Sequence, residues 1–188
     1  MPEPVPPHAL RLTLIGYRGC GKTTVGRKVA ERLACPFVDA DRVLESRLGE
    51  PISTWFPSHG EPAFRAQEAA CLADILRGGD AVVLSTGGGA VLLPGNRELL
   101  RARGGLVVFL DCPAAVLRGR LLQDGGNRPS LTGLPIADEV ERLLGERMPF
   151  YRATAHQTVD ATRSPAAIAD ELVRLFHARS TAASTPGP

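Results

Sequence analysis

The stretch that decides the fold of this chain is GYRGCGKTT, residues 16–24. A short apolar run of the kind that forms a buried strand, LRLTLIG, leads into it. The segment KTTVGRKVAERLA leads out of it with a helical pattern, since Val25, Val29 and Leu33 fall on one helix face. A glycine-rich turn between a strand and a helix lets backbone N–H groups face a phosphate, and the helix N-terminus adds partial positive charge. The stretch therefore predicts that the chain binds a nucleoside triphosphate.

The spacing inside this stretch fits the phosphate-binding pattern GxxxxGK[ST] in full, with Gly16, Gly21, Lys22 and Thr23 at the fixed positions. Lys22 can reach the β- and γ-phosphate oxygens, and the Thr23 hydroxyl can ligate Mg²⁺. The pattern does not name the phosphate acceptor. The sequence has no guanine-selecting NKxD segment, which argues against a Ras-type GTPase. Asp111, at the end of LVVFLD, is a weaker candidate for a magnesium ligand; the alternative is a core strand whose last residue leaves the sheet.

The bulk composition is that of a globular protein with one sizeable core. The chain has 188 residues, of which 44% are apolar and 22% charged. The net charge of +2 and the scattered arginines argue against a nucleic-acid partner. Four cysteines without CxxC spacing predict free thiols rather than disulfides or a metal site. Because no signal-like start or membrane-length apolar stretch is present, we expect a cytoplasmic protein without a membrane partner.

Apolar runs and helical patterns alternate along the chain, which predicts a parallel sheet covered on both faces, a three-layer α/β domain. The Pro-, Ser- and Thr-rich ends, residues 1–9 and 179–188, are expected to be disordered, with a single domain over 10–178. A polar, glycine-rich segment at about 122–134 is long enough to move. Strands are expected at 10–16, 36–41, 81–85, 106–111 and 157–161. Helices are expected at 22–34, 41–49, 51–56, 61–79, 96–105, 113–122, 136–155 and 165–178.

The acidic pair in FVDAD, Asp39 and Asp41, follows the second expected strand. Alternation along an extended segment points both side chains to one side, at the sheet edge where open α/β folds bind ligands. One carboxylate can serve the magnesium shell while the other faces an acceptor hydroxyl. The alternative for Asp41 is a helix N-cap, which is compatible with catalysis.

Arginines and glycines complete the pattern of a kinase for an anionic acceptor. Arg65 and Glu68 in GEPAFRAQE lie one helical turn apart, either as a weak surface salt bridge or as a guanidinium positioned for an anion. The glycines at 87–89 follow a strand, so a ligand can approach the backbone there; a bare loop is the alternative. Arg128 lies in the polar segment, where closure would bring its charge to the transferred phosphoryl group, and Arg147 lies in ERMPFYR.

These motifs, in their order and spacing, make the sequence resemble the shikimate kinases from about Leu12 to Phe176. The resemblance implies a P-loop three-layer sandwich of the nucleoside monophosphate kinase type, with a five-stranded parallel sheet in the order 2-3-1-4-5 and a mobile lid. It implies transfer of the ATP γ-phosphate to the 3-hydroxyl of shikimate, on the route to chorismate and the aromatic amino acids. It also implies Mg²⁺ as cofactor, shikimate and ATP as substrates, and a monomer.

The resemblance further assigns roles to individual residues. It implies that Asp39 holds magnesium through water and that Asp41 accepts the hydroxyl proton. It also implies that Arg65 and Arg147 bind the shikimate carboxylate and that Glu68 holds Arg65 in place. The implied catalytic residues are Lys22, Asp41 and Arg128. The implied ATP-binding residues are Gly19, Cys20, Gly21, Lys22, Thr23, Thr24, Arg120, Arg128 and Arg163. The implied substrate-binding residues are Asp41, Arg65, Gly87, Gly88, Gly89 and Arg147, and the implied metal-binding residues are Thr23 and Asp39.

Some alternatives stay open at this stage. A gluconate kinase of the same fold is the nearest rival, and a nucleoside monophosphate kinase or a non-catalytic binding protein are further ones. Family members usually have a glycine where this chain has Ala34–Pro36, and a leucine where it has Ser130. Cys20 is either a reactive thiol or an inert small residue. Three aromatic residues fit either a substrate pocket or the core, namely Trp55, Phe56 and Phe64.

Overall fold

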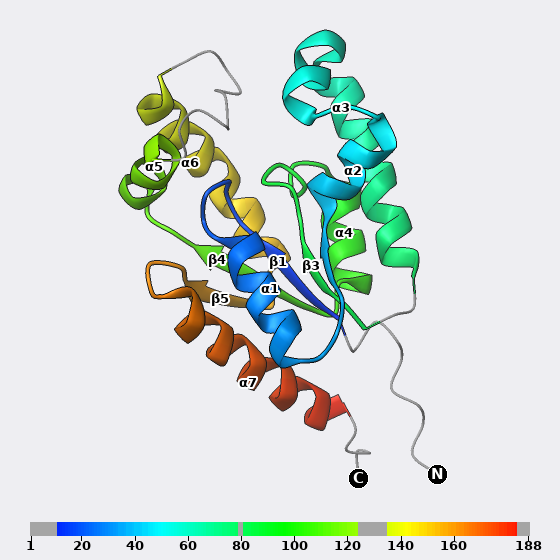
Figure 1. Cartoon of the computed structure of the whole chain (residues 1–188), viewed down its shortest axis with the longest axis vertical. Helices are drawn as coiled ribbons and strands as arrows, with labels where there is room; N and C mark the ends of the chain where they lie inside the picture. Colours follow the sequence, from blue (N-terminus) through cyan, green and yellow to red (C-terminus); the bar gives the residue numbers. More distant parts are fainter. Residues whose placement is uncertain (1–10, 79–80, 124–134, 184–188) are drawn as a thin grey trace.

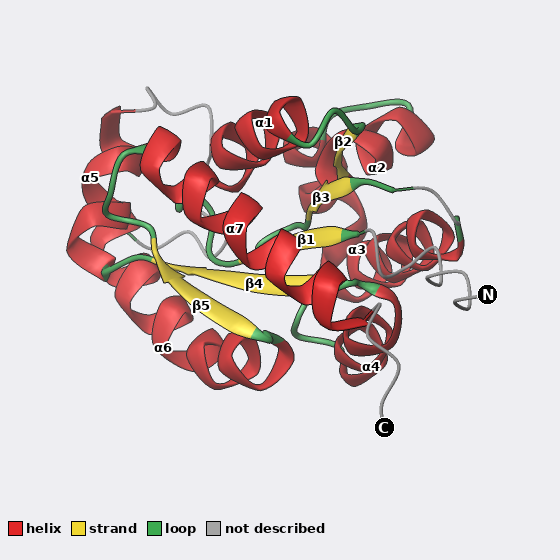
Figure 2. Cartoon of the chain, turned by 90° about the horizontal axis from the view of Figure 1, so that it is seen from below, coloured by secondary structure: helices red, strands yellow, loops and turns green. Residues whose placement is uncertain are grey.

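A computed structural model describes residues 11–78, 81–123 and 135–183. Five parallel strands form one sheet in the order β2-β3-β1-β4-β5, with helices on both faces, so the predicted fold class is confirmed (Figures 1 and 2). Along the chain the elements are β1 (Leu12–Ile15), α1 (Lys22–Arg32), β2 (Phe37–Asp39), α2 (Ala40–Leu48), α3 (Ile52–Arg77), β3 (Val83–Ser85), α4 (Pro94–Arg103), β4 (Leu106–Asp111), α5 (Ala114–Gln123), α6 (Ile136–Thr154), β5 (Gln157–Asp160) and α7 (Pro165–Ala183).

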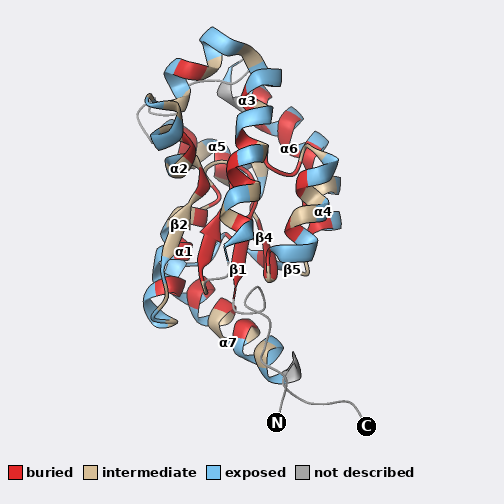
Figure 3. Ribbon diagram, turned by 90° about the vertical axis from the view of Figure 1, so that its right-hand side faces the viewer, coloured by how far each residue is buried: buried red, intermediate tan, exposed pale blue. Residues whose placement is uncertain are grey.

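The central strands are buried because helices cover both faces of the sheet. Helices α1 and α7 pack together on one face, and α3, α4 and α6 cover the other. Every residue of β1 is buried, and Leu12 pairs in register with Val83 on one side and Leu106 on the other. Figure 3 shows this burial concentrated along β1 and β4 and on the inward faces of the helices. Such two-sided burial explains why the strands are apolar runs rather than alternating patterns.

The parallel arrangement brings the carboxyl ends of all five strands to one edge of the sheet, which we call the carboxyl edge. At this edge the glycine-rich stretch 16–24 follows β1, the acidic pair lies where β2 passes into α2, and the glycines at 87–89 follow β3. Open α/β sheets bind ligands at this edge. The fold therefore collects three sequence motifs that lie far apart along the chain.

Several boundaries differ from the expected ones for local reasons. The expected helices at 51–56 and 61–79 are joined within α3, where Gly60 interrupts the helix with φ 80°. The expected strand at 36–41 ends at Asp39, and Asp41 already lies in α2. Helix α7 continues to Ala183, five residues into the C-terminal segment that the sequence analysis set apart from the domain. Ser180 and Thr181, whose hydroxyls donate to carbonyls one turn back, belong to this extension.

The end of α1 shows the consequence of the missing glycine. The Cys35 N–H donates to the Ala30 carbonyl at 3.0 Å, and the Ala34 N–H donates to the Glu31 carbonyl at 3.3 Å. These two bonds form the Schellman helix end, in which the residue after the C-cap takes a left-handed conformation. Here that residue is Ala34, with φ 48°. An alanine therefore adopts a left-handed conformation that costs glycine less free energy.

Among the described residues, no helix is both long and apolar enough to cross a bilayer.

Candidate active site

The phosphate-binding loop joins β1 to α1 as the sequence predicts. Gly16, at φ 145°, begins the loop, and a Cβ atom there would stand 2.9 Å from the Leu110 carbonyl oxygen. Lys22 is buried, and its Nζ donates to the Gly16 carbonyl at 2.8 Å and to the Tyr17 carbonyl at 3.0 Å. These bonds hold the ammonium group inside the curve of the loop, at the N-terminus of α1.

The two residues assigned to magnesium lie together beside the loop. The Thr23 hydroxyl donates to Asp39 Oδ2 at 2.8 Å. The second oxygen, Oδ1, accepts the Asp41 N–H at 3.2 Å, so Asp39 and not Asp41 is the N-cap of α2. The N-cap alternative for Asp41 was therefore wrong. A hydroxyl and a carboxylate oxygen beside a phosphate-binding loop are hard oxygen donors, which fit Mg²⁺.

A cavity of about 870 Å³ lies over the loop at the carboxyl edge. Its walls come from the loop, from α2 and α3, from the turn after β3, and from the β5–α7 turn. Of the residues that the sequence analysis assigned, the cavity is lined by Gly19, Cys20, Gly21, Lys22, Thr23, Thr24, Asp39, Asp41, Gly88, Arg120 and Arg163. Arg128 lies outside the described residues.

Gly87 and Gly89 allow the backbone of the triplet to approach three charged side chains. A Cβ atom at Gly87 would lie 2.5 Å from Glu68 Oε1 and 2.7 Å from Asp41 Oδ1. A Cβ atom at Gly89 would lie 2.2 Å from Arg65 Nη1. Real Cβ atoms do not approach other atoms so closely, and any side chain here would displace the neighbouring charges. The triplet is therefore a close-packed wall of the site and not a bare loop.

Arg65 is fixed by two carboxylates. Its Nη1 donates to Glu68 Oε2 at 2.6 Å, and its Nη2 donates to Glu61 Oε1 at 3.1 Å. The side chains of Arg65 and Glu68 are only 12% and 7% exposed, so this pair is no weak surface salt bridge. Glu61 was missed by the sequence analysis, although its i, i+4 spacing to Arg65 is a signal that could have found it.

Asp41 has the electrostatic environment of a base. Burial raises the pKa of its carboxyl to about 6, against the opposing effect of Lys22. The nearby carboxylates of Asp39 and Glu68 raise this pKa further. A carboxylate with a pKa near neutrality accepts a proton more readily than an ordinary aspartate and is still ionised at pH 7.

Arg147 reaches the glycine triplet from α6. It is 5% exposed, its Nη1 lies 3.5 Å from the Gly88 carbonyl oxygen, and its Cζ lies 5.5 Å from the centre of the Tyr17 ring. The charge of Arg147 also lowers the pKa of Glu68, the partner of Arg65, although burial is the larger effect and raises it. The two arginines predicted to bind an anion thus lie near one carboxylate and one glycine turn.

Arg120 and Arg163 line the large cavity, whereas Arg65 and Arg147 are not among its lining residues. Arg120 donates to the Cys20 carbonyl at 3.3 Å and to the Ala161 carbonyl at 3.0 Å, and so links the phosphate-binding loop to the β5–α7 turn. Arg163 pairs with Glu171 of α7 and donates to the Asp160 carbonyl at 3.3 Å. Both side chains border the cavity, as an adenine-side role requires.

An ion pair that the sequence analysis missed connects the loop to α6. Arg18, inside the glycine-rich stretch, pairs with Glu139 in the first turn of α6. Their side chains are 14% and 0% exposed. The two residues are 121 positions apart, so no local pattern could have shown the pair.

The three aromatic residues divide between the two predicted roles. Phe56 borders the cavity. Trp55 and Phe64 are buried in a small cluster with Leu44 and Cys71, in which Phe64 also packs edge-on against Phe56 with ring centres 5.2 Å apart. Phe56 is therefore placed for substrate contact, whereas the other two belong to the core.

All four cysteines are free thiols, as expected. Cys20, within the loop, is 1% exposed, and its Sγ lies 3.8 Å from Lys22 Nζ. This burial favours the inert reading of Cys20 over a reactive thiol. Burial also raises the pKa of Cys112 to about 11.

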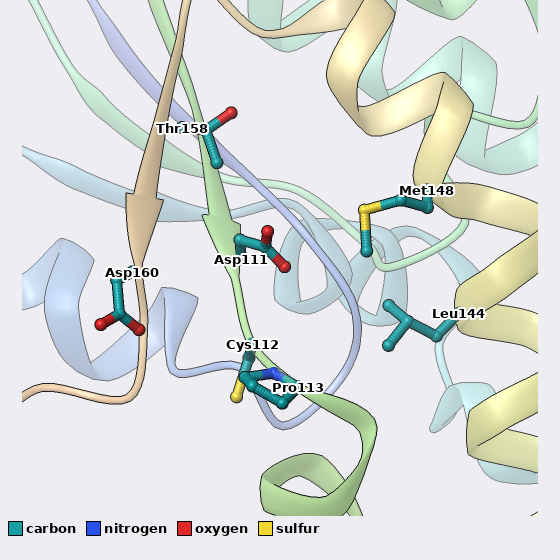
Figure 4. Close-up of a pocket in the computed structure, with 7 residues that line it drawn as sticks. All are labelled: Asp111, Cys112, Pro113, Leu144, Met148, Thr158 and Asp160. Carbon is teal, nitrogen blue, oxygen red and sulfur yellow. The ribbon is translucent and has the colours of Figure 1, made fainter.

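A smaller recess of about 330 Å³ lies between the β4–β5 end of the sheet and α6 (Figure 4). Figure 4 shows the Asp111 carboxylate directed toward Leu144 and Met148, with Asp160 on the neighbouring strand. Asp111 borders this recess and not the large cavity. Asp39, which bonds Thr23, is therefore better placed than Asp111 for magnesium.

The sheet order, the phosphate-binding loop, and the acids and arginines around one cavity define the class of P-loop kinases that phosphorylate small molecules. A family model described as shikimate kinase matches residues 18–177. Among curated proteins, shikimate kinase 2 of Dickeya chrysanthemi is 44% identical over 163 residues, which cover 86% of this chain and 92% of that protein. The shikimate kinase of Oleidesulfovibrio alaskensis is 45% identical over 170 residues, with 89% and 98% covered. The chain belongs to the shikimate kinase family.

Solved structures agree with this assignment. A shikimate kinase from Acinetobacter baumannii in complex with shikimate superposes with a TM-score of 0.83 at 36% identity, covering 89% of this chain and 93% of that one. A gluconokinase from Sinorhizobium meliloti reaches a TM-score of 0.59 at 20% identity, covering 93% of each chain. The gluconokinase shares the fold only. These relationships favour the shikimate kinases over the gluconate kinase rival.

Proposed function

We propose that this chain transfers the γ-phosphoryl group of ATP to the 3-hydroxyl of shikimate, giving shikimate 3-phosphate and ADP. Family membership supports the activity. One observation supports the position of the acceptor site. The glycines at 87–89 pack directly against Asp41 and Arg65, beside the phosphate-binding loop.

In this proposal ATP lies along the large cavity with its phosphates at the loop. Lys22 neutralises phosphate charge, and the N–H groups of residues 19–24 bind phosphate oxygens. Thr23 and Asp39 would hold Mg²⁺, which when bound would supply positive charge beside the phosphates. Arg120 and Arg163 border the adenine end.

The acceptor lies on the other side of the loop, between α3 and the glycine triplet. Arg65 and Arg147 bind its carboxylate, because planar guanidinium groups match carboxylate geometry. Glu61 and Glu68 prevent Arg65 from turning away before the acceptor binds. Gly88 offers backbone to the substrate.

In the proposed chemical step the protein forms no covalent bond with either substrate. The transition state of phosphoryl transfer is loose, so positioning and charge neutralisation supply most of the rate. The acceptor oxygen forms a bond to phosphorus as the bond to the ADP oxygen breaks, and Asp41 accepts the hydroxyl proton. Arg128, which lies outside the described residues, completes the charge neutralisation in this proposal. We also propose that the enzyme is a monomer and that it is cytoplasmic; the free thiols support the location only.

The test is ADP release from Mg·ATP with shikimate, gluconate, AMP, CMP or no acceptor. We expect turnover with shikimate alone and its loss in Asp41→Asn. The matched control is Asp74→Asn, which changes an exposed carboxylate paired with Arg47 and Arg77 on the surface. Turnover with another acceptor would overturn the substrate assignment, and full activity of Asp41→Asn would overturn the base.

A further inference from the structure

The phenol of Tyr151 lies in the core beside the glycine triplet. Tyr151 lies on α6, one helical turn after Arg147, and is 0% exposed. Its hydroxyl donates to the Gly88 carbonyl oxygen at 2.5 Å. The ring stacks on Phe109 of β4, with ring centres 4.9 Å apart and planes 14° apart. The direction of the hydroxyl is therefore fixed by packing.

Burial also fixes the protonation state of this group. It raises the pKa of the Tyr151 phenol above its usual value, against the charge of Arg147. The phenol is consequently protonated at pH 7 and is a hydrogen-bond donor there. Because water does not reach this place, a polar group left without its hydrogen-bond partner here costs free energy of folding.

The acceptor of this bond, the Gly88 carbonyl, is the point where three parts of the site meet. The same oxygen lies 3.5 Å from Arg147 Nη1. On its other side Gly88 packs against the phosphate-binding loop, since a Cβ atom at Gly88 would stand 3.2 Å from the backbone nitrogen of Arg18. Because the peptide unit is planar and trans, fixing this C=O also fixes the direction of the following N–H, that of Gly89.

We propose that Tyr151 is a positioning residue for the acceptor site. By holding the Gly88 carbonyl toward α6, its hydroxyl sets the orientation of the glycine triplet between Arg147 and Arg65, and keeps the Arg147 guanidinium beside a fixed acceptor. The inference rests on the proposed function, which places these arginines and the triplet against shikimate. Tyr151 itself is buried and is not among the residues that line the large cavity.

The test is Tyr151→Phe, which removes the hydroxyl and keeps the stacked ring. We expect the KM for shikimate, and the Kd for shikimate measured by calorimetry without nucleotide, to rise about tenfold, the effect of one lost buried hydrogen bond. The KM for ATP should stay within about twofold, because the phosphate-binding loop keeps its own bonds. A second variant, Phe109→Leu, keeps the hydroxyl but frees its direction, and we expect a rise of about threefold in the same KM.

The matched control is Thr154→Val on the same helix. Thr154 is also 0% exposed, and its hydroxyl donates to the Phe150 carbonyl at 2.7 Å, away from the triplet. We expect a similar loss of melting temperature in both variants and an unchanged KM for shikimate in the control. An unchanged KM in Tyr151→Phe, or an equal rise in both substrates' KM values, would overturn the inference. A wild-type protein inactive on shikimate would instead refute the proposed function.

Discussion

Replacing Gly89 by alanine should disable the acceptor site without disturbing the fold. The new Cβ atom would lie 2.2 Å from Arg65 Nη1 and 2.6 Å from its Cζ. Since ordinary contact begins near 3.4 Å, the guanidinium must withdraw by about 1 Å. It is the movable end of a flexible side chain, so the clash is relieved there and not in the backbone. A displacement of that size in a binding group lowers kcat/KM by about 100-fold, or about 2.7 kcal/mol of transition-state stabilisation.

The assay is steady-state ADP release with shikimate varied at saturating Mg·ATP, and then with ATP varied. We expect the loss for Gly89→Ala in kcat/KM for shikimate, with the KM for ATP within about twofold of wild type. Thermal unfolding followed by circular dichroism establishes that the variant is folded. A folded variant that keeps kcat/KM for shikimate within about threefold of wild type would refute the reasoning, because Arg65 would then have no fixed part in binding.

The control is Gly95→Ala in the first turn of α4. A Cβ atom at Gly95 has nothing within 4 Å, so the substitution meets no neighbour. We expect unchanged kinetics and a free energy of unfolding raised by about 0.5 kcal/mol, since alanine loses less backbone entropy on folding. A loss of shikimate turnover in this control would show that the effect at Gly89 is not specific to Arg65.

Three further outcomes are expected. Ala34→Gly should raise the free energy of unfolding in urea by about 1 kcal/mol, because a left-handed φ of 48° costs alanine that much; a decrease would contradict this. Glu139→Gln should lower the same free energy by about 3 kcal/mol, because the Arg18 charge loses its buried partner; a loss below about 1 kcal/mol would place the pair among surface salt bridges. For Asp41, whose pKa is raised to about 6, kcat/KM for shikimate at saturating Mg·ATP should be level above that pH and fall below it as the carboxylate protonates; a level profile down to pH 5 would argue against Asp41 as base.

The sequence predicted the sheet and the phosphate-binding loop because both depend on local patterns. Each buried strand is a short apolar run, and the glycine-rich loop has fixed spacing between Gly16 and Lys22. The expected strand geometry of the acidic pair was wrong, although both residues border the cavity. Asp39 and Asp41 were expected to alternate along one strand, whereas β2 ends at Asp39 and the first turn of α2 brings Asp41 to the cavity.

The contacts that fix the site could not be predicted, because they join residues far apart in sequence. Arg18 and Glu139 are 121 positions apart, and Tyr151 and Gly88 are 63 apart. Each pair depends on where α6 packs against the sheet. A lone tyrosine or glutamate on a helix gives no local sign of its partner, since most such residues face solvent or fill the core.

Phosphate binding and acceptor binding use different parts of this fold, which explains how one fold can serve different acceptors. The shape of the phosphate-binding loop depends on its backbone geometry and on the bonds of Lys22. Neither depends on which molecule receives the phosphoryl group. Acceptor choice must then reside in groups outside the loop. In the proposed function these are Arg65, held by carboxylates on α3, and Arg147, which lies beside the Gly88 carbonyl to which Tyr151 donates. Because both arginines lie beside the same glycine triplet, a change in the triplet's backbone would displace the two guanidinium groups relative to each other and, under the proposed function, weaken their joint binding of a carboxylate.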